Sequence, residues 1–320
     1  MVTGVGGNER SWENMNVFGR SFIANGVNVL GSEFTTGSTF YVSSTVAAAS
    51  GTGDGLSPQF PLATIAAAVA KCTANKGDRI YVLPGHAENI GAAAAIAVAT
   101  AGIRIIGLGR GASVPTLSWT AAAATITVTA ASVSFENFRF VNNFVDVVTM
   151  FSVSGAGDDL AFVNCLFMDT STVLNAIDFI TLATGADGLA ILGCQVIGRS
   201  AQNDSFITGV AHDRILIDKC QIQFDVAQAA VVGVIETSGN ATNVWVRDSL
   251  FRSNVDGALF LDFNGAANSG AVSNCYFSSI DVAGAVTDGF DFTGGHFFEC
   301  YASGDADAYG IICGGVTAAN

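Results

Sequence analysis

Carboxylate side chains are the residues of this 320-residue chain that come nearest to a catalytic arrangement. Two carboxylates held on one face can share the acid and base steps of a hydrolysis. Asp262 and Asp291 have matching surroundings, since they lie 29 residues apart in the similar segments 261–263 and 290–292. If those segments stack, the two carboxylates become neighbours. Solvated aspartates on an acidic surface explain the pair at least as well, so no catalytic residue is predicted.

The other acidic and basic candidates form no recognisable motif, and they are Asp178, Asp218, Asp248, Arg214, Lys219, Arg247 and Arg252. Lys219 and Arg247 flank Asp218 and Asp248, which predicts a ladder of exposed ion pairs, each contributing about 0–1 kcal/mol. The three histidines are scattered, without a paired nucleophile. Neither a Cys-x-x-Cys motif nor a Cys/His cluster occurs, so no metal and no cofactor is predicted.

A motif that returns about every 25 to 30 residues makes up most of the chain. Any site must therefore be positioned by the elements that this motif forms. The motif reads apolar, any, apolar, any, polar, Cys, any, apolar, as in Leu160, Phe162, Asn164, Cys165 and Phe167. The alternation predicts β-strands with an inward apolar face. One inward slot carries a cysteine in five repeats, which predicts a structural core ladder of small, buried, free thiols; its members are Cys165, Cys194, Cys220, Cys275 and Cys300.

The spacing of the repeat varies, which excludes a strict short-period solenoid but fits a coiled β-architecture with loops of different lengths. Parallel strands stack about 4.8 Å apart, so eight or nine turns make a rod about 40 Å long. Inward positions are apolar, and we expect outward positions to be Ser, Thr, Asp and Asn. Asn137, Asn164 and Asn274 precede the inward slot, at predicted bends where asparagine tolerates left-handed backbone.

Charge and hydropathy limit the partners. The net charge of −14 opposes binding to the phosphates of nucleic acid. Half of the residues are apolar, yet polar residues interrupt every run before the roughly 18 residues that a membrane span needs. The first ten residues, MVTGVGGNER, lack a basic region followed by an apolar stretch. We therefore expect a protein made in a cytoplasm, with no membrane and no nucleic acid among its partners.

Residues 1–39 lack the repeat and form a predicted N-terminal docking arm, with aromatic residues at Trp12, Phe18, Phe22 and Phe34. Residues 40–320 form the predicted repetitive body. This body opens with Gly-Thr-Gly-Asp-Gly at 51–55, a predicted amphipathic helix near 61–73 that starts at Pro61, and the strand Gly-Asp-Arg-Ile-Tyr-Val-Leu-Pro-Gly at 77–85.

This opening order resembles the start of the right-handed parallel β-helix domains of the pectate-lyase-like superfamily. The resemblance covers about residues 40–315 and implies an all-β, single-stranded right-handed parallel β-helix with an N-terminal capping helix. It identifies the fold far better than the activity, because such folds occur in lyases, hydrolases and phage virion proteins. No matching cap is visible after Tyr309, and an open end needs a partner, so we expect a homotrimer, as in the phage β-helix proteins that the chain resembles.

The phage branch of the resemblance implies a non-enzymatic virion structural protein. The first expectation is a trimeric capsid decoration (cement) protein on the head surface, whose arm contacts the major capsid protein. The arm is nearly neutral, since residues 1–40 carry two basic and three acidic groups. The alternative is a phage tail spike or fibre protein that binds or cleaves host surface polysaccharide as a lyase or glycoside hydrolase.

Overall fold

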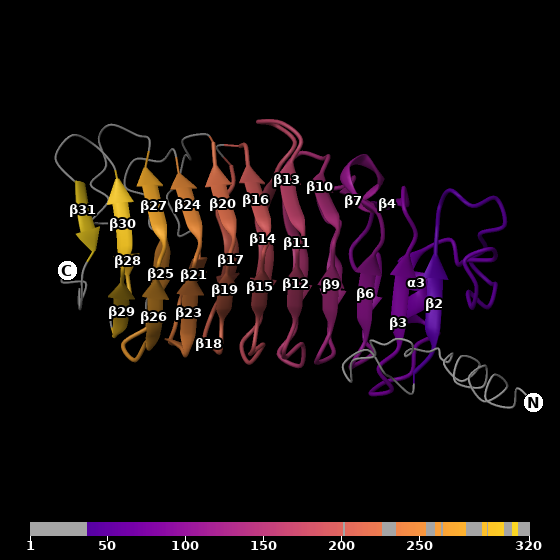
Figure 1. The fold of residues 1–320 in the computed structure, drawn as a ribbon, viewed down its shortest axis with the longest axis horizontal. Coiled ribbons are helices and arrows are strands. Elements are labelled where there is room, and N and C mark those ends of the chain that lie inside the picture. Colours follow the sequence, from indigo (N-terminus) through magenta and orange to yellow (C-terminus); the bar gives the residue numbers. More distant parts are fainter. Residues whose placement is uncertain are drawn as a thin grey trace, which may run out of the picture.

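The computed structural model describes residues 37–200, 202–225, 235–253, 260–263, 265–279, 290–292, 294–303 and 309–312. These residues coil into a rod walled by three long sheets, which we call sheets I, II and III (Figure 1). Within each sheet the neighbouring strands are parallel, apart from one antiparallel pair at the C-terminal end of sheet II.

Sheet I has ten strands, namely β2 (Thr39–Val42), β3 (Arg79–Val82), β6 (Arg104–Gly107), β9 (Ser134–Glu136), β12 (Ala161–Val163), β15 (Ala190–Leu192), β19 (Leu216–Asp218), β23 (Val244–Arg247), β26 (Gly270–Ser273) and β29 (Gly295–Phe298). Sheet II also has ten, namely β4 (Ala87–Ile90), β7 (Thr116–Trp119), β10 (Arg139–Asn142), β13 (Leu166–Asp169), β16 (Gln195–Gly198), β20 (Gln221–Phe224), β24 (Leu250–Ser253), β27 (Tyr276–Ser279), β30 (Cys300–Ser303) and β31 (Tyr309–Ile312).

Sheet III has eight strands, namely β5 (Ile96–Val98), β8 (Ile126–Val128), β11 (Val147–Val153), β14 (Ala176–Leu182), β17 (Ser205–Gly209), β21 (Ile235–Thr237), β25 (Leu261–Phe263) and β28 (Phe290–Asp291). A short pair joins β18 (His212–Asp213) and β22 (Ala241–Thr242). The chain passes from sheet I to II to III and back, and eight described turns from β3 to β28 place a strand in all three sheets. The predicted right-handed parallel β-helix is thereby confirmed.

The core is a stack of apolar side chains, because each strand points alternate residues inward and the turns lie in register. Its centre is aromatic, since Phe140, Phe151 and Phe162 are fully buried. The ring centroid of Phe151 lies 4.9 Å from that of Phe140 and 4.8 Å from that of Phe162. Burying each such side chain contributes about 1.5–3 kcal/mol. Edge-to-face pairs add about 0.5–1.5 kcal/mol each.

The repeated motif is longer than one strand, which corrects the sequence interpretation. In each copy, two short strands of sheets I and II meet at a bend that we call the I–II corner. The bend residue adopts left-handed backbone, with φ of 60°, 52° and 51° at Asn137, Asn164 and Asn274, as predicted. The amide of Asn137 donates 2.7 Å to the Gly107 carbonyl. At the same place Gly193 has φ +63°, and a Cβ there would lie 2.7 Å from Asn164 Oδ1.

The N-terminal helix α3 spans only Ile65–Val69 rather than residues 61–73. It begins late because Thr64 is its N-cap, and the Thr64 side chain accepts a hydrogen bond from Ala67 N at 3.2 Å. Leu62 instead forms β-bridges to Val42 and Ser50. A second short helical element, of 3₁₀ type, covers Gly111–Ser113.

The C-terminal end of sheet II also differs from expectation, because β31 pairs antiparallel with β30 and covers its edge. In the part of the chain that the structure describes, no helix has the length and hydropathy to cross a membrane.

Outward residues differ between the sheets. On sheet III one aligned column is polar: Thr127, Ser152, Thr181 and Thr208 are followed in register by Glu236, Asp262 and Asp291. On sheets I and II the corresponding columns are largely apolar or aromatic in the middle and C-terminal turns. The expectation of polar outward positions therefore holds for this column of sheet III and only in part for sheets I and II, where polar and apolar residues alternate along the rod.

Candidate functional site

Asp262 and Asp291 lie on sheet III and are Cα partners of neighbouring strands, so the predicted stacking of their positions is confirmed. Asp262 is only 8 % exposed, which excludes a fully solvated carboxylate there. Farther along the sheet, Asp178 accepts a 2.9 Å hydrogen bond from Ser205 Oγ. Burial raises the pKa of Asp178 to about 6. Asp262 also pairs in register with Glu236 of the preceding turn, so three consecutive turns of this face each carry an acidic residue at the same strand position.

The five ladder cysteines lie immediately after the bend at the I–II corner, each at most 2 % exposed, and all five are free thiols. Their sulfur atoms lie against carbonyl oxygens of the preceding turn, as from Cys194 to Phe162 O and from Cys220 to Ile191 O, both at 3.4 Å. Burial raises the pKa of Cys220 to about 12. The Cys220 thiol is therefore neutral at physiological pH.

Ser249 occupies the ladder position between Cys220 and Cys275. Its hydroxyl accepts from Cys220 N at 3.1 Å and donates to Arg247 O at 2.7 Å. The column therefore consists of small side chains whose polar atoms bind the backbone of adjacent residues, and its contribution is structural.

The predicted ion-pair ladder is present at the I–II corner. Lys219 Nζ lies 3.4 Å from both Asp218 Oδ1 and Asp248 Oδ2, and Arg247 Nε lies 3.1 Å from Asp218 Oδ1. The two basic side chains are 68 % and 51 % exposed. Pairs this exposed contribute roughly 0–1 kcal/mol each.

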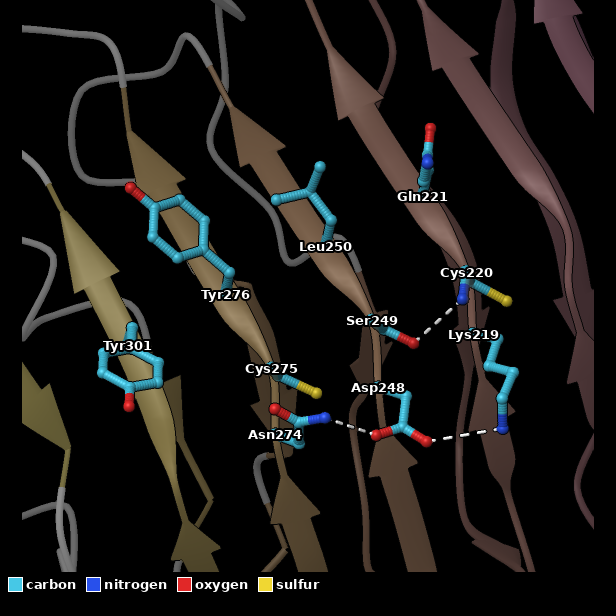
Figure 2. Close-up of a pocket in the computed structure, with 10 residues that line it drawn as sticks. All are labelled: Lys219, Cys220, Gln221, Asp248, Ser249, Leu250, Asn274, Cys275, Tyr276 and Tyr301. Carbon is cyan, nitrogen blue, oxygen red and sulfur yellow. Dashed lines mark hydrogen bonds and ion pairs between the residues drawn. The ribbon is translucent and has the colours of Figure 1, made fainter.

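A shallow hollow of about 360 Å³ opens beside this ladder on the sheet II side of the corner (Figure 2). Its wall is an outward column of sheet II in which Gln221, Leu250, Tyr276 and Tyr301 are successive Cα partners. Leu250, Tyr276 and Tyr301 are 39 %, 43 % and 48 % exposed. Large apolar surfaces on consecutive turns are thus open to a ligand lying along the rod.

The other wall of the hollow is polar. Asp248 Oδ1 accepts a hydrogen bond from Asn274 Nδ2 at 2.7 Å, and Oδ2 faces Lys219 Nζ (Figure 2). The hydrogen bond from Asn274, with the positive charge of Lys219, holds the pKa of Asp248 below its ordinary value. Asp248 is therefore an ionised acceptor at neutral pH, beside an ammonium group and an amide.

The same corner is hollowed a second time, nearer the N-terminal end. A depression of about 450 Å³ is lined by Asn137 and Asn164 at the bends and by Arg139, Leu166 and Gln195 on the wall. These wall residues belong to the same column as Gln221 and the tyrosines. We call the column from Arg139 to Tyr301 the corner track, and it consists of Arg139, Leu166, Gln195, Gln221, Leu250, Tyr276 and Tyr301.

Sequence reasoning missed this track. Tyr276 and Tyr301 each follow a ladder cysteine, at a motif position that was treated as free to vary. An aromatic residue recurring one position after the cysteine was the available signal. The arm residues Trp12, Phe18, Phe22 and Phe34 lie outside the described residues. Within the part of the chain that the structure describes, no group of three or more His, Cys, Asp and Glu side chains is arranged to hold a metal ion.

No protein-family model matches the chain, and no curated protein matches it. Solved structures that are similar include a rhamnogalacturonan lyase, with 13 % identity and a TM-score of 0.45, covering 78 % of this chain and 75 % of that one. Two others are pectin methylesterases in complex with hexasaccharides, at 12 % and 13 % identity with TM-scores of 0.47 and 0.43, each covering 84 % of this chain and 90 % of theirs. At these identities the likeness is one of fold.

Proposed function

We propose that the protein is a non-enzymatic binding rod that holds an extended polysaccharide along the corner track. The observation that carries this proposal is the hollow at the I–II corner, where Tyr276 and Tyr301 stand exposed in register opposite Asp248, Asn274 and Lys219. A sugar chain presents apolar C–H faces and polar hydroxyl edges. Tyrosine rings suit the former, and the amide, carboxylate and ammonium groups suit the latter.

The linear form of the track supports a chain-like ligand rather than a compact one. Seven neighbouring turns contribute one residue each to the track, at intervals of about 4.8 Å. The resulting strip is about 30 Å long and narrow. Two hollows lie on it, and both combine bend residues with track residues.

The groups that line the C-terminal hollow favour binding over glycoside hydrolysis. Glycoside hydrolysis needs two carboxyl groups, one of which is protonated to act as an acid. Among the ten residues lining this hollow, Asp248 is the single carboxylate. Its pKa is lowered by the hydrogen bond from Asn274, so it carries no proton to donate at neutral pH.

The test is binding of the Tyr276→Ala and Tyr301→Ala variants to a panel of immobilised bacterial surface polysaccharides. Each truncation should weaken binding about tenfold, because loss of a stacked ring removes about 1–1.5 kcal/mol. Phe60→Ala is the matched control, since Phe60 is 65 % exposed and lies outside both hollows. Unchanged binding by both track variants, or release of sugar fragments by the wild type, would refute the proposal.

Capsid decoration, as a virion structural protein on the phage head, is a second candidate. It is favoured by the arm, which carries four large aromatic residues and a charge near zero on a chain of net charge −14. Deleting residues 1–36 leaves β2 and the described rod complete. A decoration protein should lose binding to purified capsids on this deletion, whereas polysaccharide binding through the track should persist.

A further inference from the structure

The outer face of sheet I presents two straight columns of side chains, which we call columns a and b. The ten strands lie side by side along the rod in Figure 1, with residues in register from turn to turn. Column a consists of Thr39, Arg79, Arg104, Ser134, Ala161, Ala190, Leu216, Trp245, Ala271 and His296, and column b consists of Tyr41, Tyr81, Ile106, Glu136, Val163, Leu192, Asp218, Arg247, Ser273 and Phe298.

The composition of this face is that of a protein interface. Its central turns are apolar, and Trp245 and Phe298 remain 53 % and 54 % exposed. Aromatic residues and arginine are enriched in protein interfaces, whereas lysine, aspartate, glutamate, serine and alanine are depleted; the face has the aromatic and arginine enrichment but also three alanines and two serines. The face contains no lysine, and its two carboxylates are paired, Glu136 with Arg104 at 2.8 Å and Asp218 with Arg247 at 3.1 Å.

Charge favours this face over the rest of the surface for contact with a second copy. Two chains of net charge −14 repel each other. The two columns contain three arginines, of which Arg79 is only 9 % exposed, together with two carboxylates and no other charged residue, so the face is close to neutral. Two copies can therefore approach through it without the repulsion that opposes contact through the acidic column of sheet III.

In two central turns, those of β12 and β15, the columns are complementary to each other in size. Where column a has Ala161 or Ala190, column b of the same turn has Val163 or Leu192. A two-fold axis parallel to the rod would bring column a of one copy against column b of the other at the same level. Each alanine then receives a branched side chain, and Trp245 faces Arg247 of the second copy in a cation–π arrangement.

The available area is sufficient for a specific contact. Six strands of four residues and four of three, at a spacing of about 4.8 Å, make a face of about 570 Å² per copy and about 1,100 Å² in total. A specific interface needs at least about 1,000 Å² in total. We infer that two copies of the chain pair as parallel rods through the outer faces of sheet I, related by a two-fold axis along the rod, with column a against column b.

Mass in solution and charged variants test the pairing. Light scattering at micromolar concentration should give twice the chain mass of 32.7 kDa. Leu192→Glu should weaken pairing at least tenfold, because it places a carboxylate against Ala190 of the second copy. Gln195→Glu is the matched control, since it adds the same charge to the exposed outer column of sheet II in the same turn. A monomer, a trimer, or equal effects of both variants would overturn the inference.

Cross-linking tests the direction of pairing. A mixture of Ala190→Cys and Leu192→Cys chains should form disulfide-linked pairs under mild oxidation, because these positions oppose each other in the parallel arrangement. Antiparallel packing about the centre of the face would instead link Ala161→Cys to Ala190→Cys. The five ladder cysteines are buried. The wild-type protein, oxidised in the same way, measures any disulfide linkage through the natural cysteines. Preferential linkage of Ala161→Cys to Ala190→Cys would overturn the parallel arrangement.

Discussion

The outer face of sheet III and the outer faces of sheets I and II cover the same phenylalanine core with opposite chemistry. Sheet III is lined by hydroxyl and carboxyl residues, whereas sheets I and II carry Leu192, Trp245, Tyr276 and other apolar groups. Register and inward stacking are alike on all three sheets. The fold therefore constrains the inward residues, whereas the outward residues differ in chemistry from sheet to sheet.

The largest effect on stability should come from changes in the phenylalanine core, which all three sheets cover. Phe162→Ala removes a fully buried ring that stacks on Phe135 and contacts Phe151, so the free energy of unfolding should fall by about 3–5 kcal/mol. The outward neighbour change Val163→Ala should cost under about 1 kcal/mol. Denaturant unfolding of both variants measures the difference. Similar losses would mean that the inner and outer positions of one strand are equally important for stability.

The second prediction concerns the pH dependence of stability, which we assign to Asp169 where the chain passes from sheet II to sheet III. Asp169 ends β13, is fully buried, and accepts hydrogen bonds from Ala176 N at 3.0 Å and Asn203 Nδ2 at 2.8 Å. Burial raises the pKa of Asp169 to about 6 from an ordinary 3.8. The folded state therefore holds this proton more tightly than the unfolded state, and its contribution to stability is greatest below about pH 4 and is lost as pH rises to about 6.

The loss amounts to at most about 3 kcal/mol, since one pKa unit corresponds to about 1.4 kcal/mol. The measurement is denaturant unfolding between pH 4 and pH 7 for the wild type and for Asp169→Asn. The difference in the free energy of unfolding between the wild type and Asp169→Asn should change with pH in this window. Asp248→Asn, at the I–II corner, is the control and should keep the pH dependence of the wild type. A pH-independent difference for Asp169→Asn would contradict the assignment.

The third prediction exchanges an apolar and a polar residue between the outer faces of sheets I and III, and it expects a smaller effect on stability. Val163→Thr on sheet I and Thr181→Val on sheet III reverse the chemistry of two outward positions, and Thr181 loses its 2.9 Å hydrogen bond to Thr149. Each should change the free energy of unfolding by about 1 kcal/mol or less. Only Val163→Thr should weaken pairing of the chains, which sedimentation analysis measures. If Val163→Thr and Thr181→Val weakened pairing equally, the proposed difference between the outer faces of sheets I and III would be wrong.

The inward half of this molecule was predictable from sequence because strand alternation makes core residues periodic. The repeat located the cysteine column, the left-handed bends at Asn137 and Asn164, and the stacking of Asp262 on Asp291. Of the outward half, only the ion-pair ladder and the stacking of Asp262 on Asp291 were predicted, because nothing in the alternation restricts the type of a residue that faces away from the core. The corner track became visible only when the register placed Tyr276 beside Tyr301.

The smallest effect should come from the exposed charges of the I–II corner. Arg247→Gln removes the 3.1 Å ion pair to Asp218 and should reduce the free energy of unfolding by less than about 1 kcal/mol. Salt should shrink that difference further, because the pair is exposed. Thermal unfolding at low and high salt measures both quantities.

Lys219→Asn is the companion change at the same corner. Lys219 has φ +56°, a left-handed conformation that asparagine adopts more readily than lysine. The relief of backbone strain should offset the lost ion pairs to Asp218 and Asp248, so that the stability of this variant stays within about 0.5 kcal/mol of the wild type. A fall of more than about 2 kcal/mol in the free energy of unfolding of either variant would contradict this prediction. It would show that the ion pairs, and not the buried cysteine ladder, stabilise the I–II corner.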